Sequence, residues 1–163
     1  MSLALQNASG GNFVLGSAAL TGLSGAATTY STSAVNQVIR GASFTKAAVA
    51  GGATPTTDAV SGAAMTLVAN QARLFCWGLN AAGTVQVIAG PVAAWTDTTA
   101  LSTKLEQPSL PDTFALFATV VIKAGATTVG TWTFGSSNWN ATGIVVDPVV
   151  NRFAAPDAAF YTA

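Results

Sequence analysis

The sequence alternates short apolar runs with clusters of turn-forming residues. Candidate turns recur about every 8 to 12 residues, the spacing expected of strands in a β-sandwich or barrel. No long stretch repeats apolar residues at the i, i+3, i+4, i+7 spacing of an amphipathic helix. Threonine, valine and glycine are abundant; all three lower helix propensity, and β-branched residues favour strands. The pattern therefore predicts a single all-β domain, a β-sandwich or jelly roll with extended N- and C-terminal arms.

The clearest predicted element is a β-hairpin over residues 73–89. Residues of its first strand alternate between two faces, with Arg73, Phe75, Trp77 and Leu79 on one and Leu74 and Cys76 on the other. The loop that follows has the sequence NAAG, in which Gly83 can adopt a left-handed conformation. Residues 84–89 then return as the second strand.

Other segments also have the composition of strands. We predict strands at residues 13–15, 35–39, 42–49, 65–69 and 114–122. The last of these is almost wholly apolar, which indicates either a strand buried on both faces or a buried helix. A second hairpin is predicted to turn at Ala124–Gly125 and to return through residue 134.

Two connections stand out between these strands. Residues 51–62 are rich in Gly, Thr and Pro and are predicted to form a loop. Residues 96–112 are the most polar connection, and within them residues 97–107 are predicted to form one or two helical turns, with Asp97 as the cap.

The chain is predicted to have three parts: an N-terminal arm over residues 1–29, a β-domain over 30–146 and a C-terminal tail over 147–163. The arm either orders on a neighbouring subunit or is a flexible terminus. The tail has three aromatic residues, Phe153, Phe160 and Tyr161, which suit docking on a neighbour or on the chain's own core. We therefore take these three as candidate contact residues.

Charge is scarce in this sequence. Only 7% of the 163 residues are charged and the net charge is zero, so charge repulsion does not keep copies apart. This favours a subunit of an assembly over a neutral, Thr-rich monomer. The six Lys and Arg residues are scattered, which argues against nucleic-acid binding. The long uncharged stretches contain Gly, Asn and Gln, and no basic n-region precedes them, so we expect neither a membrane span nor a secretory signal.

Residues for catalysis or metal binding are few. Histidine is absent, which removes the commonest general base and metal ligand. Cys76 is alone and lies among apolar residues, so we expect a buried, inert thiol. Most acidic residues lie beside Pro, Thr or Gly in predicted loops, where Asp is ordinary turn chemistry. We therefore expect a protein that is not an enzyme and that holds no metal and no cofactor.

The segment TWTFGSSNWNATG, residues 131–143, places two tryptophans among polar residues. Trp132 and Trp139, flanked by Asn138 and Asn140, could form a sugar-binding platform or contact a neighbouring subunit. Alternatively, Trp132 shares a buried face with Phe134, and Trp139 covers the open end of the core. The sequons at residues 7–9 and 140–142 are interpreted as accidental. Trp132 and Trp139 join the candidate contact residues.

Roughly residues 35–145 resemble a family of small Ala/Thr/Gly-rich structural proteins of tailed bacteriophages. The resemblance is carried by ANQARLF followed one residue later by W, and by LPDT, VIKAG and FGSSNWNATG. It implies a virion structural protein, and specifically a capsid decoration (cement) protein that stabilises the lattice of the major capsid protein. The expected partners are that protein and copies of the chain itself, as a trimer or alternatively a dimer. The expected location is the capsid exterior, after assembly in the cytoplasm of the bacterial host.

Two alternatives share this composition. One is a tail, neck or baseplate component of the virion. The other is a head-fibre or receptor-binding module for host glycans, which exposure of Trp132 or Trp139 would support.

Overall fold

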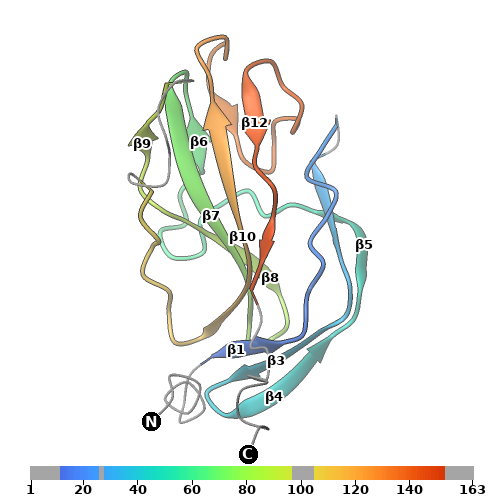
Figure 1. Ribbon diagram of the computed structural model, residues 1–163. Coiled ribbons are helices and arrows are strands. Elements are labelled where there is room, and N and C mark those ends of the chain that lie inside the picture. Colours follow the sequence, from blue (N-terminus) through green and yellow to red (C-terminus); the bar gives the residue numbers. More distant parts are fainter. Residues whose placement is uncertain (1–11, 26–27, 97–104, 153–163) are drawn as a thin grey trace, which may run out of the picture.

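The computed structural model describes residues 12–25, 28–96 and 105–152. Within them the regular structure consists of antiparallel strands and includes no helix, so the all-β prediction is confirmed (Figure 1). A sandwich or jelly-roll arrangement stays a prediction. The strands are β1 (Phe13–Leu15), β2 (Thr29–Thr32), β3 (Val35–Ile39), β4 (Ala42–Lys46), β5 (Val49–Ala53), β6 (Thr66–Leu67), β7 (Gln71–Asn80), β8 (Val85–Ala89), β9 (Ala93–Ala94), β10 (Phe114–Ala124), β11 (Trp132–Thr133), β12 (Ile144–Val146) and β13 (Val150–Asn151).

A six-stranded sheet is the largest element of the fold (Figure 1). Its strand order is β12-β10-β7-β8, with β13 also paired to β10 and β9 to β7. The long strands β7 and β10 pair from end to end, with a bulge between Leu116 and Ala118 that adds Phe117 to one strand. Because Phe117 is fully buried, the bulge directs an extra large side chain into the core. Residues 114–122 thus form a strand and not a buried helix, and most of them are buried, although Leu116 and Val121 are partly exposed.

The hairpin predicted over residues 73–89 is confirmed as β7 and β8. Gly83 has a φ of +73° in the connecting turn, so glycine is favoured there. Phe75, Trp77 and Leu79 point into the main core, whereas Cys76 lies on the other face with Ile88. The period of two therefore placed these side chains correctly.

A second, bent hairpin packs against this sheet. Its inner arm is β2 and β3, and its outer arm, residues 42–53, is β4 and β5. The two arms pair from Thr29 opposite Ala53 to Ile39 opposite Ala42. The inner arm also pairs on its other side, with β1 and with a bridge at Thr21. The bent hairpin is the long curved ribbon at the lower right of Figure 1.

Aromatic rings join the two layers in one core. The ring of Tyr30, from β2, lies 5.2 Å from that of Trp77 in the central sheet. Phe134 stacks on Phe75 at 4.4 Å and contacts Trp139 edge to face at 5.3 Å. Burying a side chain of this size contributes roughly 1.5–3 kcal/mol, so this cluster is a main source of stability.

Several strand predictions need correction. The hairpin turning at Ala124–Gly125 is wrong, because β10 pairs with β7, β12 and β13, and β11 pairs with β6. The physical reason is that Trp132 and Phe134 bury their rings in the core, which takes this segment away from β10. The strand predicted at 42–49 is divided into β4 and the start of β5, and the loop predicted from residue 51 begins inside β5. The strand predicted at 65–69 shortens to β6.

The predicted arm boundaries also differ from the structure. Val14, Leu20 and Leu23 are core residues, so the described part of the N-terminal segment belongs to the domain. Val150 and Asn151 pair with β10, which extends the domain beyond residue 146. Residues 97–104 of the predicted helical turns lie outside the described residues, and 105–107 have no regular structure.

Candidate interaction surface

Trp132 and Trp139 are both buried, with exposed fractions of 3% and 2%. The indole N–H of Trp132 donates to the Asn138 carbonyl at 3.0 Å, and that of Trp139 to the Thr29 carbonyl at 3.4 Å. Their rings lie 5.8 Å apart and pack on Phe134. The prediction of Trp132 and Trp139 as contact residues is therefore wrong, and Trp139 closes the core. The other candidates, Phe153, Phe160 and Tyr161, lie outside the described residues.

Asp58 is the most highly connected acidic residue of the described chain. It is 7% exposed, and its Oδ1 accepts hydrogen bonds from the Val60 N–H at 3.0 Å and from the N–H and hydroxyl of Ser61 at 2.7 and 2.9 Å. Its Oδ2 accepts from the Ala89 N–H at 2.8 Å. The N–H of the next residue, Ala59, donates to the Val87 carbonyl. Asp58 and Ala59 thus occupy backbone groups on the outer edge of β8.

The ionisation of Asp58 fits this structural role. Burial alone would raise the pKa of its carboxyl, but the hydrogen bonds from Ala89, Ser61 and Val60 outweigh burial and lower the pKa below its ordinary value. Arg73 lies near enough for a favourable charge interaction, and its Nε donates to the Gly90 carbonyl at 2.5 Å. The carboxylate that these groups hold is charged and already hydrogen-bonded, so it is poorly suited to act as a general base.

The remaining reactive groups of the described residues do not gather into a metal site. Cys76 is fully buried; burial raises the pKa of its thiol to about 11, against a smaller lowering by Arg152. In the described ranges no three Cys, Asp or Glu side chains lie close enough together to hold a metal ion. One surface hollow there has a volume of about 380 Å³ and is lined by Asp58, Arg73 and Pro108 among others.

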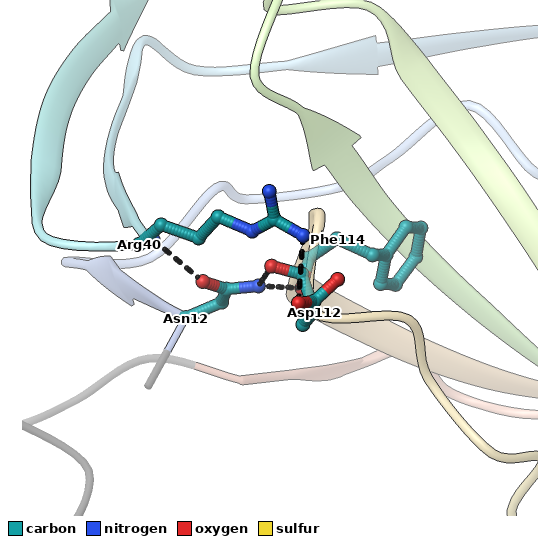
Figure 2. A network of polar contacts seen from close by, with 4 residues as sticks. All are labelled: Asn12, Arg40, Asp112 and Phe114. Carbon is teal, nitrogen blue, oxygen red and sulfur yellow. Dashed lines mark hydrogen bonds and ion pairs between the residues drawn. The ribbon is translucent and has the colours of Figure 1, made fainter. Parts of the chain in front are cut away.

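A polar network fixes the tip of the bent hairpin (Figure 2). The Asn12 amide N–H donates to the carbonyls of Asp112 and Phe114 at 2.6 and 3.2 Å, and its Oδ1 accepts from the Arg40 N–H at 2.9 Å. Arg40 also forms an ion pair with Asp112 at 2.7 Å. The network ties β1, the β3–β4 turn and the start of β10 together. It therefore holds the outer arm in a fixed position relative to the central sheet.

The β3–β4 turn determines which backbone groups of β4 are free. Arg40 and Gly41 have φ values of +50° and +80°, as in a two-residue turn with both residues left-handed. The flanking residues Ile39 and Ala42 then form a hydrogen-bonded pair, and pairs of this kind alternate along the ladder. The N–H and C=O groups of Ser43 and Thr45 consequently point away from β3.

The outer arm is an open sheet edge within the described part of the chain. β4 is the last strand of its sheet, and β5 pairs with β2 alone. Lys46 is the single charged residue between Arg40 and Asp58, and proline is absent until Pro55. Most side chains of the arm are small and exposed. Natural edges are normally protected by charge, proline or a covering loop, so this edge has little protection against strand addition.

The sequence did not identify the outer arm as a candidate surface. The scarcity of charge between Arg40 and Asp58 is visible in the sequence. Whether a strand lies at an edge, however, depends on neighbours that are distant in sequence.

Comparison with known proteins gave no match. No family model, no curated protein and no solved structure matches the chain. Among the described residues, no helix is long and apolar enough to cross a membrane.

Proposed function

We propose that this chain is a structural protein of a tailed bacteriophage virion, and specifically a capsid decoration protein. It binds the outside of the capsid at junctions between capsomers and stabilises the lattice by contact alone. The partners are the major capsid protein and further copies of this chain, arranged as a trimer or alternatively as a dimer. No catalytic step and no cofactor is part of the proposal.

The open outer arm is the observation that carries this proposal. An exposed edge offers unpaired N–H and C=O groups, and another chain can pair with it by strand addition. The contrast with β8 is informative, because the backbone of that edge is occupied by Asp58 and Ala59. One edge is thus closed by the chain's own loop, whereas no strand of the described chain pairs with the outward groups of Ser43 and Thr45.

Composition and resemblance also support the proposal. The centres of protein interfaces are depleted of charge, and this chain has only 7% charged residues with no net charge. The strings LPDT, VIKAG and FGSSNWNATG resemble structural proteins of tailed phages. Strand addition between unlike surfaces of neighbouring copies closes into a ring when the rotation permits, which is how a trimer would form.

A cryo-electron microscopy map of the virion that encodes this chain tests the proposal. The expected result is density for the β-domain on the capsid exterior, with the outer arm within pairing distance of a strand from a capsid subunit or another copy. Mass spectrometry of purified virions is the accompanying measurement. Density in the tail, neck or baseplate, or absence of the chain from the virion, would contradict the proposal.

A further inference from the structure

The central sheet has a second face, opposite the aromatic core. Directly opposed residues of antiparallel strands share a face, which places Leu74 with Val121, Cys76 with Thr119, and Val150 with Thr119. By the same register Val145 is on this face, opposite Lys123. We call the apolar part of this surface, made of Leu74, Val121, Val145 and Val150, the second face.

The second face is incompletely covered by the described residues. At one end Trp95 lies under Lys123, whose ammonium group is 5.6 Å from the indole centroid and pairs with Asp147. At the other end Leu110 packs on Cys76, Ile88 and Phe114. Between these ends Val145 and Val150 are 46% and 49% exposed.

The described chain ends on this face. Arg152 follows Val150 by two residues and therefore points to the same side of the sheet, where its Nε lies 3.4 Å from the Thr119 hydroxyl oxygen. Its backbone N–H donates to the Phe117 carbonyl, so β13 is paired up to this point. Arg152 makes no ion pair with another described residue.

The sequence beyond Arg152 suits this surface. Residues 153–163, FAAPDAAFYTA, contain three aromatic residues and one charge, Asp157. Pro156 lacks an N–H, which disfavours continuation of a strand ladder. Eleven residues reach about 36 Å when extended, whereas the strands of a sheet are about 4.8 Å apart. The segment is therefore long enough to cross from β13 over β10 and β7.

From this we infer that residues 153–163 pack on the second face of their own molecule, with the aromatic rings on Val145 and Val150 and Asp157 paired with Arg152. Docking in the same molecule is favoured over exchange between copies, because the tether gives an effective concentration on the order of millimolar. The inference does not depend on where the protein resides in a virion. It leaves the outer arm as the free surface for a partner.

Fluorine NMR of the full chain tests this inference. The chain has two tyrosines, Tyr30 in the core and Tyr161 in the segment, so 3-fluorotyrosine labelling gives one internal reference and one probe. A soluble gadolinium chelate should broaden neither resonance in the native protein. The Val145→Asp variant should expose Tyr161 to the chelate and leave Tyr30 protected. Val129→Asp is the matched control, since Val129 is 90% exposed on a loop, and it should change neither resonance.

Hydrogen exchange of the C-terminal peptide is the second measurement, since it needs no labelled side chain. Its amides should exchange roughly tenfold faster or more in Val145→Asp than in the native chain, at equal thermal stability. The inference is overturned if Tyr161 is freely accessible in the native protein, or if Val145→Asp changes neither readout, as it would if another segment covered the face. Protection that disappears on dilution from 100 to about 1 μM would show exchange between copies and overturn docking in the same molecule.

Discussion

Asp58 stabilises the edge of β8 through hydrogen bonds from its own loop and from the strand itself. Three donors converge on Oδ1 and one on Oδ2, and the residue is almost completely buried. The Arg40–Asp112 pair is a useful contrast, because both of its side chains are more than half exposed. Charged residues in water contribute little through pairing, whereas a buried carboxylate with several donors contributes more.

Replacement of Asp58 should reveal this difference. Asp58→Asn removes the charge and replaces one acceptor oxygen by an amide group, so at least one donor loses its partner. We expect a loss of about 1–3 kcal/mol in the free energy of unfolding. The matched variant Asp112→Asn should lose about 0–1 kcal/mol. Urea unfolding of both variants checks the prediction, and equal losses would contradict it.

Asp58 should also give the protein a specific sensitivity to acid. Its folded-state pKa is lower than the ordinary value of 3.8, so its stabilising contribution is complete above that value and is lost as the pH falls through the folded pKa. The stability difference between the native chain and Asp58→Asn should therefore be constant near neutral pH and shrink below about pH 3.8. Urea unfolding at a series of pH values measures this, and a pH-independent difference would argue against it.

The reactivity of Cys76 tests whether strand β7 is buried as the structure shows. Its thiol is fully buried and has a pKa of about 11. At pH 8 about one Cys76 side chain in a thousand is then a thiolate, and a thiol reagent in solution cannot reach the buried sulfur. Ellman's reagent should react with the native protein far more slowly than with the protein in urea. Rapid reaction of the native chain would contradict the burial of this strand.

At the scale of elements, the strands that the sequence predicted were those with a local signal. The hairpin of β7 and β8 combines alternating side chains with Gly83 in its turn, and β3 was predicted with its correct bounds. Strands β6 and β11 have two residues each, too few for a period of two to show. Their pairing follows from the burial of Leu67 and Trp132, a contact between segments distant in sequence.

The candidate site was predictable only in part. The sequence showed the shortage of charge and chemistry, and strand periodicity placed Trp132 beside Phe134 in the core. Trp139 lies in a turn, where periodicity gives no direction, and its indole N–H donates to the carbonyl of Thr29, which is distant in sequence. The open state of the outer arm also depends on topology, because β5 gains a partner on one side from β2 and none on the other within the described residues.

Close packing of the two long strands can be tested at Gly78. A methyl group there would overlap the Phe114 ring and come within 2.7 Å of the Ala115 carbonyl oxygen. Since that backbone is fixed in the sheet, Gly78→Ala should lower the free energy of unfolding by about 1–3 kcal/mol. Gly52→Ala is the comparison, because the atoms near its new methyl group are side-chain atoms of Val49 and Tyr30, and it should cost less. Chemical denaturation of both variants measures the difference.

At the scale of the molecule, the two layers have different edges. The central sheet uses the Asp58 loop to occupy the outer edge of β8, whereas the bent hairpin presents its outer arm without a cover from the described chain. The Asn12 network fixes the arm against the sheet, so the edge is held in place before a partner binds. A strand edge that is already fixed loses less conformational entropy when a partner binds than a mobile edge does.

Attachment of a Ser43→Pro variant to the capsid is the most direct test of the proposed role of the outer arm. Proline removes the outward N–H of Ser43 and leaves the ladder bonds between β3 and β4 in place, as proline at strand edges normally does. Ser43→Ala is the matched control, because it removes the hydroxyl and keeps the N–H. Both variants should have melting temperatures close to that of the native chain.

The measurement is the occupancy of each variant on capsids that lack this chain, taken from the phage that we propose encodes it, and it is determined by quantitative electrophoresis after sedimentation. We expect native occupancy for Ser43→Ala. For Ser43→Pro we expect an apparent affinity at least tenfold weaker, about 1.4 kcal/mol, consistent with loss of one main-chain hydrogen bond and local disruption of the added strand. Equal occupancy of the two folded variants would contradict attachment through the outer arm.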